Sequence, residues 1–215
     1  MRRLVLALSV LVLAACDAAE VEPAPVMRAP AEYTVTLEAT WSATTHPEAF
    51  PSNPHFSRLT GAVHGPGLTL WRVGGPASDG VRSMAETGNT EALRTLVEGL
   101  GTRAVYLEGE PVRLSPGSGS ASFTATEQHP LATVVTMLAP SPDWFVGTNG
   151  LDLRTPDGWA DRVEVDAVVY DAGTDDGTTY TAANASRAER APITLVDYAP
   201  LAGTSVGTLV FERVP

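Results

Sequence analysis

The stretch Tyr33-Thr34-Val35-Thr36-Leu37-Glu38-Ala39-Thr40-Trp41 alternates apolar and polar residues. Successive side chains of a β-strand point to opposite faces, so this alternation predicts a strand with one buried and one exposed face. Other β-rich runs, separated by Gly, Pro, Asn and Asp, occupy residues 67–73, 121–126, 131–138, 162–170, 193–198 and 206–214. Many strands with turn residues between them predict an all-β fold, either a sandwich or a barrel.

One segment departs from the strand pattern. Residues 90–98 place Leu93, Leu96 and Val97 on one helical face, and Gly99 follows as a helix end. We therefore expect an antiparallel β-sandwich with one short helix packed on it.

The four tryptophans are interpreted as packing residues. Trp41 and Trp71 lie on faces of predicted strands that point inward. Trp144 and Trp159 are expected to pack in the core or against loops, in preference to forming a stacking platform for sugars.

The first residues predict where the protein resides. Positive Arg2 and Arg3 precede a short apolar run that reaches Cys16, a pattern typical of export signals and too short to span a bilayer. Leu-Ala-Ala-Cys at 13–16 resembles the lipobox of bacterial lipoproteins. We therefore expect a signal peptide over residues 1–15, a lipid on Cys16, a Pro- and Ala-rich linker over 16–31 and a folded domain over 32–215. An ordinary signal peptide is the alternative.

This leader predicts a protein of the bacterial cell envelope, lipid-anchored on its periplasmic or cell-surface face, that contacts the membrane through the anchor only. Cys16 is the only cysteine, so the domain has no internal disulfide. The formal net charge is −11, and the Arg residues are scattered singly. Because phosphate binding needs a basic stripe, nucleic acid is excluded as a partner.

Aspartates gather in two turn-forming stretches, Ser-Pro-Asp-Trp-Phe-Val-Gly at 141–147 and Asp-Ala-Gly-Thr-Asp-Asp-Gly at 171–177. Hard cations such as calcium take oxygen ligands from carboxylates and from the backbone carbonyls that turns expose. The second stretch does not have EF-hand spacing, because Ala182 stands where that loop needs Glu. A cation site would therefore be assembled from both stretches. The alternative is that Asp143 caps a turn and the other acids line a solvated loop.

Five motifs in order resemble the spondin domain. Three lie in the first half of the domain: His-Phe-Ser with Gly-Ala-Val-His over 55–64, Leu-Trp with Gly-Gly over 70–75, and Ala-Ser-Asp-Gly with Ala-Glu-Thr-Gly over 77–88. The two aspartate stretches complete the order, and the likeness covers residues 33–214. The resemblance implies an extracellular β-sandwich of Greek-key type, similar to calcium-dependent membrane-binding domains, that serves adhesion and partner recognition.

The resemblance also implies a calcium ion. Carried over by position, its carboxylate ligands are Asp143, Asp171 and Asp175, and a backbone carbonyl near Trp144 is a further ligand. Asp176 stands where animal members have Ser, so it is expected in a second shell or exposed to solvent. Animal members also have cysteines after the first aspartate motif, which this chain lacks.

We therefore expect a non-enzymatic, calcium-binding adhesion or recognition module whose partner is an unidentified extracellular protein or glycan. The chain has no Gly-x-Ser-x-Gly elbow and no His pair at zinc spacing. The alternative function is a carbohydrate-binding or structural envelope lipoprotein without functional metal.

Overall fold

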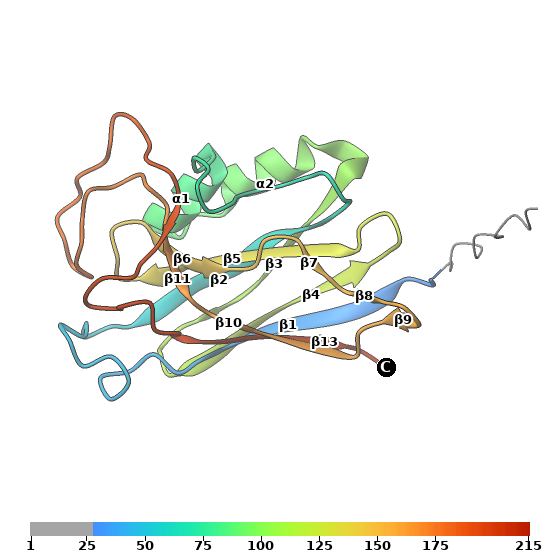
Figure 1. Ribbon diagram of the computed structural model, residues 1–215, viewed down its shortest axis with the longest axis horizontal. Helices are drawn as coiled ribbons and strands as arrows, with labels where there is room; N and C mark the ends of the chain where they lie inside the picture. Colours follow the sequence, from blue (N-terminus) through green and yellow to red (C-terminus); the bar gives the residue numbers. More distant parts are fainter. Residues whose placement is uncertain (1–27) are drawn as a thin grey trace, which may run out of the picture.

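The computed structural model describes residues 28–215, which form two antiparallel sheets packed face to face (Figure 1). The predicted signal peptide, Cys16 and most of the predicted linker lie outside these residues. The smaller sheet has the order β10 (Arg162–Asp166), β13 (Gly207–Arg213), β1 (Ala31–Ala39) and β4 (Gly117–Ala125). The larger sheet has the order β12 (Thr194–Leu195), β11 (Val169–Asp171), β6 (Trp144–Gly147), β5 (Leu131–Ala139), β2 (His55–His64) and β3 (Ala104–Val112).

Three short pieces complete the strands. β7 (Leu151–Asp152) pairs with β5, and β8 (Arg154–Thr155) pairs with β9 (Gly158–Trp159) as a small separate ribbon. The all-β sandwich expected from the alternating sequence is confirmed.

The main core lies between the two sheets. In β1 the side chains of Tyr33, Val35 and Leu37 are buried, whereas those between them are more exposed, as the alternation predicts. Trp41 is fully buried in this core, and its ring lies near those of Phe50 and Phe56. Packing therefore holds this disulfide-free domain together.

A second core covers the outer face of the larger sheet. Strand β5 is buried along almost its whole length: Val134 faces the main core, and Val135 faces helices α1 (Asp79–Thr87) and α2 (Glu91–Glu98). Figure 1 shows both helices on this side of the sandwich. A sheet buried on both faces needs apolar residues at successive positions, which removes the alternating pattern from its strands.

Residues 28–215 contain two α-helices, not one as expected. Helix α2 matches the predicted segment, and a 3₁₀ turn, η1 (Gly101–Arg103), follows it. Helix α1 was missed, although the side chain of Ser78 caps its start and Gly88, with φ 69°, ends it in the left-handed conformation. Ser and Gly are common at helix starts and ends, so the sequence contained the signals that delimit α1.

Two strand predictions were wrong in detail, and two long strands were missed. Residues 67–73 form a loop, in which Trp71 is nevertheless buried. The run at 162–170 is two strands, β10 and β11, that lie in different sheets. Strands β2 and β3 were not predicted, because β2 is buried on both faces and β3 contains Gly109 and Pro111.

The end of the predicted linker lies against the domain. Arg28 Nε and Nη2 donate to the carbonyls of Gly158 and Thr155 at 2.7 Å each, and Trp159 Nε1 donates to the Ala29 carbonyl at 2.7 Å. Across residues 28–215, every helix is too short or too polar to span a lipid bilayer.

Candidate functional site

Pairing between β6 and β11 brings the two aspartate stretches together. Asp143 stands just before β6, and Asp171 ends β11. In the antiparallel register Trp144 pairs with Asp171, and the N–H of Ala172 donates to the Asp143 carbonyl at 3.1 Å. Asp143 and Asp171, which are 28 positions apart in the sequence, thus become neighbours at one end of the larger sheet.

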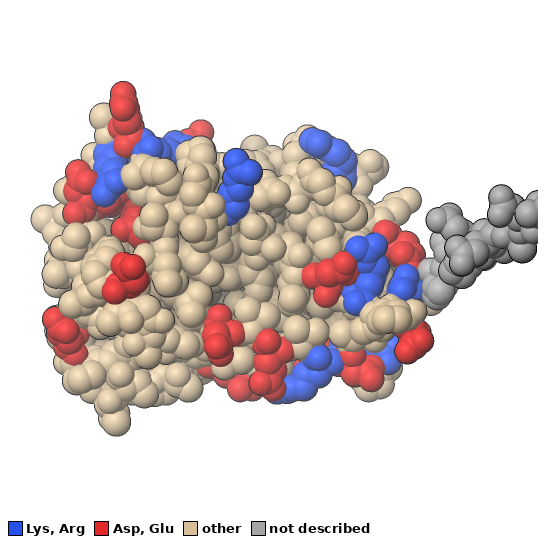
Figure 2. Space-filling model, viewed as in Figure 1, with Lys and Arg blue, Asp and Glu red and all other residues tan. Residues whose placement is uncertain are grey.

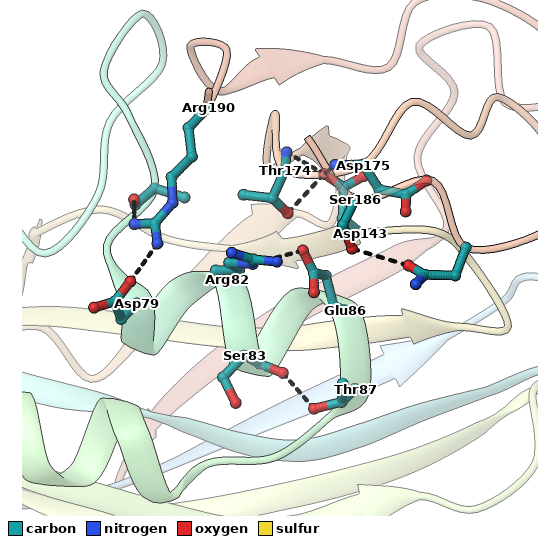
Figure 3. Close-up of polar contacts among 12 residues, drawn as sticks. Asp79, Arg82, Ser83, Glu86, Thr87, Asp143, Thr174, Asp175, Ser186 and Arg190 are labelled. Carbon is teal, nitrogen blue, oxygen red and sulfur yellow. Dashed lines mark hydrogen bonds and ion pairs between the residues drawn. The ribbon is translucent and has the colours of Figure 1, made fainter. Parts of the chain in front are cut away.

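The Asp143 carboxylate is buried and has one engaged and one free oxygen (Figure 3). Its Oδ2 accepts hydrogen bonds from Thr174 N at 2.7 Å, Thr174 Oγ1 at 3.0 Å and Asp175 N at 3.0 Å. Its Oδ1 is buried without a hydrogen-bond partner in the described part of the chain. A buried polar atom in this state costs free energy unless something binds it.

The electrostatics of Asp143 disfavour a bare carboxylate. Burial, and next the negative charge of Asp171, raise the pKa of Asp143 to about 6, against the lowering effect of the hydrogen bonds from Thr174 and Asp175. Two nearby carboxylates that lack a basic partner repel each other, and a bound cation would relieve that repulsion.

Asp171 is half-buried and held in place from two directions. Its Oδ1 accepts from Gly173 N at 2.7 Å, and its Oδ2 accepts from the Tyr198 hydroxyl at 3.2 Å. Burial, and then the charge of Asp171, raise the pKa of Tyr198, so the hydroxyl stays protonated and remains a donor. The Tyr198 ring also lies 6.1 Å from that of Trp144, which is buried in the main core.

Asp175 has another role in this geometry. Its buried carboxylate accepts from Gly177 N through Oδ1 and from Ala185 N through Oδ2, both at 2.7 Å. These bonds close the loop that follows β11. Asp176 is exposed and forms an ion pair with Arg187 at 2.8 Å.

The predicted ligands are therefore only partly gathered. Asp143 and Asp171 are electrostatic neighbours, whereas Asp175 turns its oxygens to backbone N–H groups. Within residues 28–215 no three His, Cys, Asp or Glu side chains are grouped so that they could hold a metal ion. The free Oδ1 of Asp143 and the adjacent charge of Asp171 nevertheless fit the demand of a hard cation for anionic oxygen.

Two residues that position these groups were not anticipated. Thr174 belongs to the second aspartate stretch, but nothing in its sequence context shows that it donates twice to Asp143. Tyr198 lies 27 residues beyond Asp171, and only the pairing of β11 with β12 brings its segment alongside. Neither contact could be predicted from the helical or strand periodicity of the sequence.

The histidines do not converge on this site. His46 and His64 bond to the hydroxyls of Thr45 and Thr133, and His55 and His129 bond to backbone carbonyls. Burial lowers the pKa of both His46 and His64, which favours neutral imidazoles. These contacts belong to turns and strand ends.

The fold and site define a disulfide-free β-sandwich with paired aspartate loops at one end of its larger sheet. The sequence profile of the Spondin_N family matches residues 31–200, and the chain belongs to this family. It is 36% identical over 207 residues to Spondin-1 of Gallus gallus, which covers 86% of this chain and 25% of that protein. It is also 36% identical over 165 residues to Spondin-2 of Homo sapiens, covering 73% of this chain and 50% of that protein.

The chain spans between a quarter and a half of the length of these relatives. The likeness therefore concerns the domain that they share with this chain. The spondin resemblance drawn from the five motifs is confirmed.

Proposed function

We propose that this protein is a lipid-anchored, calcium-binding recognition module of the cell envelope that works by adhesion and not by catalysis. The observation that carries the proposal is the buried Oδ1 of Asp143, which has no hydrogen-bond partner within residues 28–215 and lies beside the charge of Asp171. The family relation supports the recognition role and an extracytoplasmic location.

The Asp143 and Asp171 side chains would hold the calcium ion. Asp175 and a backbone carbonyl near Trp144 are the further ligands that the family resemblance assigns. The ion supplies the positive charge that this pair of carboxylates lacks, and it links the turn before β6 to the loop after β11. Calcium thereby stabilises the face that those two loops form.

Thermal melts in excess calcium and in EDTA test the site. Binding to the folded state alone stabilises by RT ln(1 + [L]/Kd), about 2.7 kcal/mol at a hundredfold excess over Kd. We expect calcium to raise the Tm of the parent protein and to leave that of Asp143→Asn unchanged. The matched control is Asp166→Asn, which alters an exposed carboxylate on β10 and should keep the full calcium shift. Equal melting temperatures of the parent in calcium and EDTA would contradict the proposal.

The anchor has a separate test. Cells expressing the full chain and fed a labelled fatty acid should incorporate the label into this protein, and Cys16→Ser should abolish incorporation. A labelled Cys16→Ser protein, or an unlabelled parent that remains in the membrane fraction after a carbonate wash, would contradict lipid attachment at Cys16.

Adhesion is tested by binding of the protein to immobilised extracellular proteins and to a glycan array, each with and without EDTA. Binding to a protein that EDTA abolishes supports the proposal. Glycan binding that survives EDTA would favour the metal-independent carbohydrate module instead.

A further inference from the structure

A pocket opens where β6 and β11 part. These strands pair over Trp144, Phe145 and Val146 only, after which the chain before β11 crosses to β10 in the other sheet. Strand β6 continues to Gly147 beside β5 but without β11 on its other side, and the departure of β11 leaves a cavity of about 390 Å³ there. A volume of this size is within the range of ligand-binding pockets, about 300 to 1,000 Å³.

The pocket is apolar in a strongly acidic protein. Its walls include Trp71, Val73, Val165 and Tyr170, and no charged side chain from the described part of the chain lines it, although the chain has a net charge of −11. Val73 is 57% exposed at this site. Figure 2 shows the corresponding face, which is mainly uncharged over β6 and β11 and carries acidic side chains over β10. An occupant must therefore be uncharged where it enters.

The aromatic wall is held rigidly before anything binds. Trp71 Nε1 donates to the Thr148 carbonyl at 3.0 Å, which fixes the indole in the loop before α1. Its ring centre lies 5.0 Å from that of Phe145 and 4.9 Å from that of Tyr170. A preformed wall avoids the entropy that ordering flexible side chains would cost.

The pocket also presents a free stretch of strand edge. In an antiparallel ladder the N–H and C=O of one residue point to the same neighbour, and successive residues alternate. Thr148 N–H donates to Val134 in β5, so the backbone groups of Gly147 point away from β5, toward the side that β11 has left. The residue that would face Gly147 is Val168, whose N–H donates to Asp166 instead.

Gly147 N–H and C=O therefore have no hydrogen-bond partner among the described residues, and they line the pocket. The exposed Asn149 beside them has an amide that makes no hydrogen bond within residues 28–215. A donor and an acceptor in strand geometry, next to an apolar cavity, match the main chain and one side chain of an extended peptide.

We propose that this pocket docks an extended segment of a protein partner, which pairs its main chain with Gly147 and inserts one uncharged apolar side chain against Trp71, Val73 and Val165. The inference deepens the proposed recognition function, on which it rests, by naming a protein strand as the ligand. It does not depend on calcium, because none of these residues belongs to the two aspartate stretches except Gly147, whose part is its backbone.

The test titrates the ¹⁵N-labelled full chain with acetyl-Thr-Thr-Phe-Thr-Thr-amide and follows the Gly147 amide and the Trp71 indole N–H by NMR. Two companion peptides isolate the two parts of the interaction: one has Ala in place of the central Phe, and the other carries an N-methyl group on the Phe nitrogen. We expect each to bind at least about tenfold more weakly than the parent peptide, because the first loses the anchor and the second loses a main-chain donor.

Two matched variants locate the binding. Val73→Glu places a charge at the pocket and should weaken the parent peptide by about tenfold or more. Val105→Glu changes a valine that is 51% exposed on β3, outside the pocket, and should leave the affinity unchanged. Both measurements are repeated in EDTA, where peptide binding should persist even if the calcium proposal fails.

Several outcomes overturn the inference. No shift of Gly147 up to the solubility limit of the peptides, or equal binding by Val73→Glu and Val105→Glu, removes the site. If toluene binds as tightly as the peptide and the N-methyl peptide keeps its full affinity, the cavity is a site for small apolar molecules and not for a peptide strand. Dimerisation at high concentration that Val73→Glu abolishes makes a second copy of this chain the occupant.

Discussion

Asp143 and Glu108 accept the same number of hydrogen bonds on one carboxylate oxygen but differ in their surroundings. Glu108 Oε2 accepts from Thr90 Oγ1 at 2.7 Å, Arg94 Nη2 at 3.0 Å and the Tyr106 hydroxyl at 2.6 Å, which ties α2 to β3. The three donors to Asp143 are uncharged groups of the loop after β11. Among residues 28–215, basic side chains lower the pKa of Glu108 but none acts on Asp143.

The pKa values shift in opposite directions for this reason. Burial raises the pKa of Glu108, but hydrogen bonds from Tyr106 and Thr90 and the charge of Arg94 outweigh it, so the net shift is downward. For Asp143, burial and the neighbouring Asp171 prevail, and the pKa rises to about 6. Hydrogen bonds from uncharged groups thus do not offset the burial of a carboxylate. A nearby positive charge does, and it decides whether the pKa of the buried carboxyl falls or rises.

The largest expected effect is a pH dependence of stability without calcium. The pKa of Asp143, 3.8 ordinarily and about 6 when folded, means that the folded state keeps a proton that the unfolded chain loses. The free energy of unfolding should therefore fall as pH rises from about 4 to 6.5, by roughly 3 kcal/mol relative to Asp143→Asn. Melts in EDTA across this range measure it. If the free energy of unfolding depended on pH in the same way in the parent and in Asp143→Asn, the raised pKa of Asp143 would be contradicted. Calcium should reduce the fall in stability, because it favours the ionised carboxylate.

The second effect concerns the neutralised partner in the comparison. Glu108→Ala removes the acceptor of three hydrogen bonds and leaves Arg94 without this charge, which should cost about 2 kcal/mol of unfolding free energy. Urea denaturation measures the loss. The shift of Tm on adding calcium should match that of the parent, because the α2–β3 junction holds no part of the aspartate site. A lost calcium shift would show that the two regions are coupled.

The fold was largely predictable from sequence because its smaller sheet has one solvated face. Residues 33–41 alternate visibly, and the pattern predicted β1 with its buried set. The larger sheet is covered on both faces, so β2 has no alternation to find, and the loop at 67–73 resembles a strand because Trp71 is buried there for a tertiary reason. Long-range packing, absent from any local window, decided both errors.

The sequence predicted which acidic residues belong to the site, but it did not predict their hydrogen-bond partners or their electrostatic surroundings. The two aspartate stretches identified Asp143 and Asp171, which the structure brings together through the β6–β11 ladder. The sequence could not show that Asp175 bonds to Gly177 N and Ala185 N, because a carboxylate in a turn can bind either a cation or the loop's own N–H groups. Its role as a calcium ligand remains a prediction from the family resemblance.

A third, smaller effect weakens the hydrogen bonding of Asp143 without touching its charge. Thr174→Val removes one hydroxyl donor to Oδ2 and keeps the backbone donor and the side-chain shape. We expect a loss of about 1 kcal/mol and a further rise in the pKa of Asp143, read from the pH profile in EDTA. Thr174→Ser, which keeps the hydroxyl, is the matched control. Equal profiles for the Val and Ser variants would show that backbone N–H groups alone set the pKa.

The smallest effect tests the exposed member of the aspartate cluster. Asp176→Asn removes an ion pair with Arg187 whose Asp side chain is 67% exposed, so the stability should change by about 0.5 kcal/mol or less. Since Asp176 points to solvent and pairs with its own cation, the calcium shift of Tm should also be retained, in contrast to Asp143→Asn. Calcium titrations of both variants by calorimetry decide the point. A tenfold weaker calcium affinity of Asp176→Asn would show that this carboxylate, and not only its buried neighbours, binds the cation. The loss of an exposed acid that is paired with Arg187 would not otherwise weaken calcium binding so strongly.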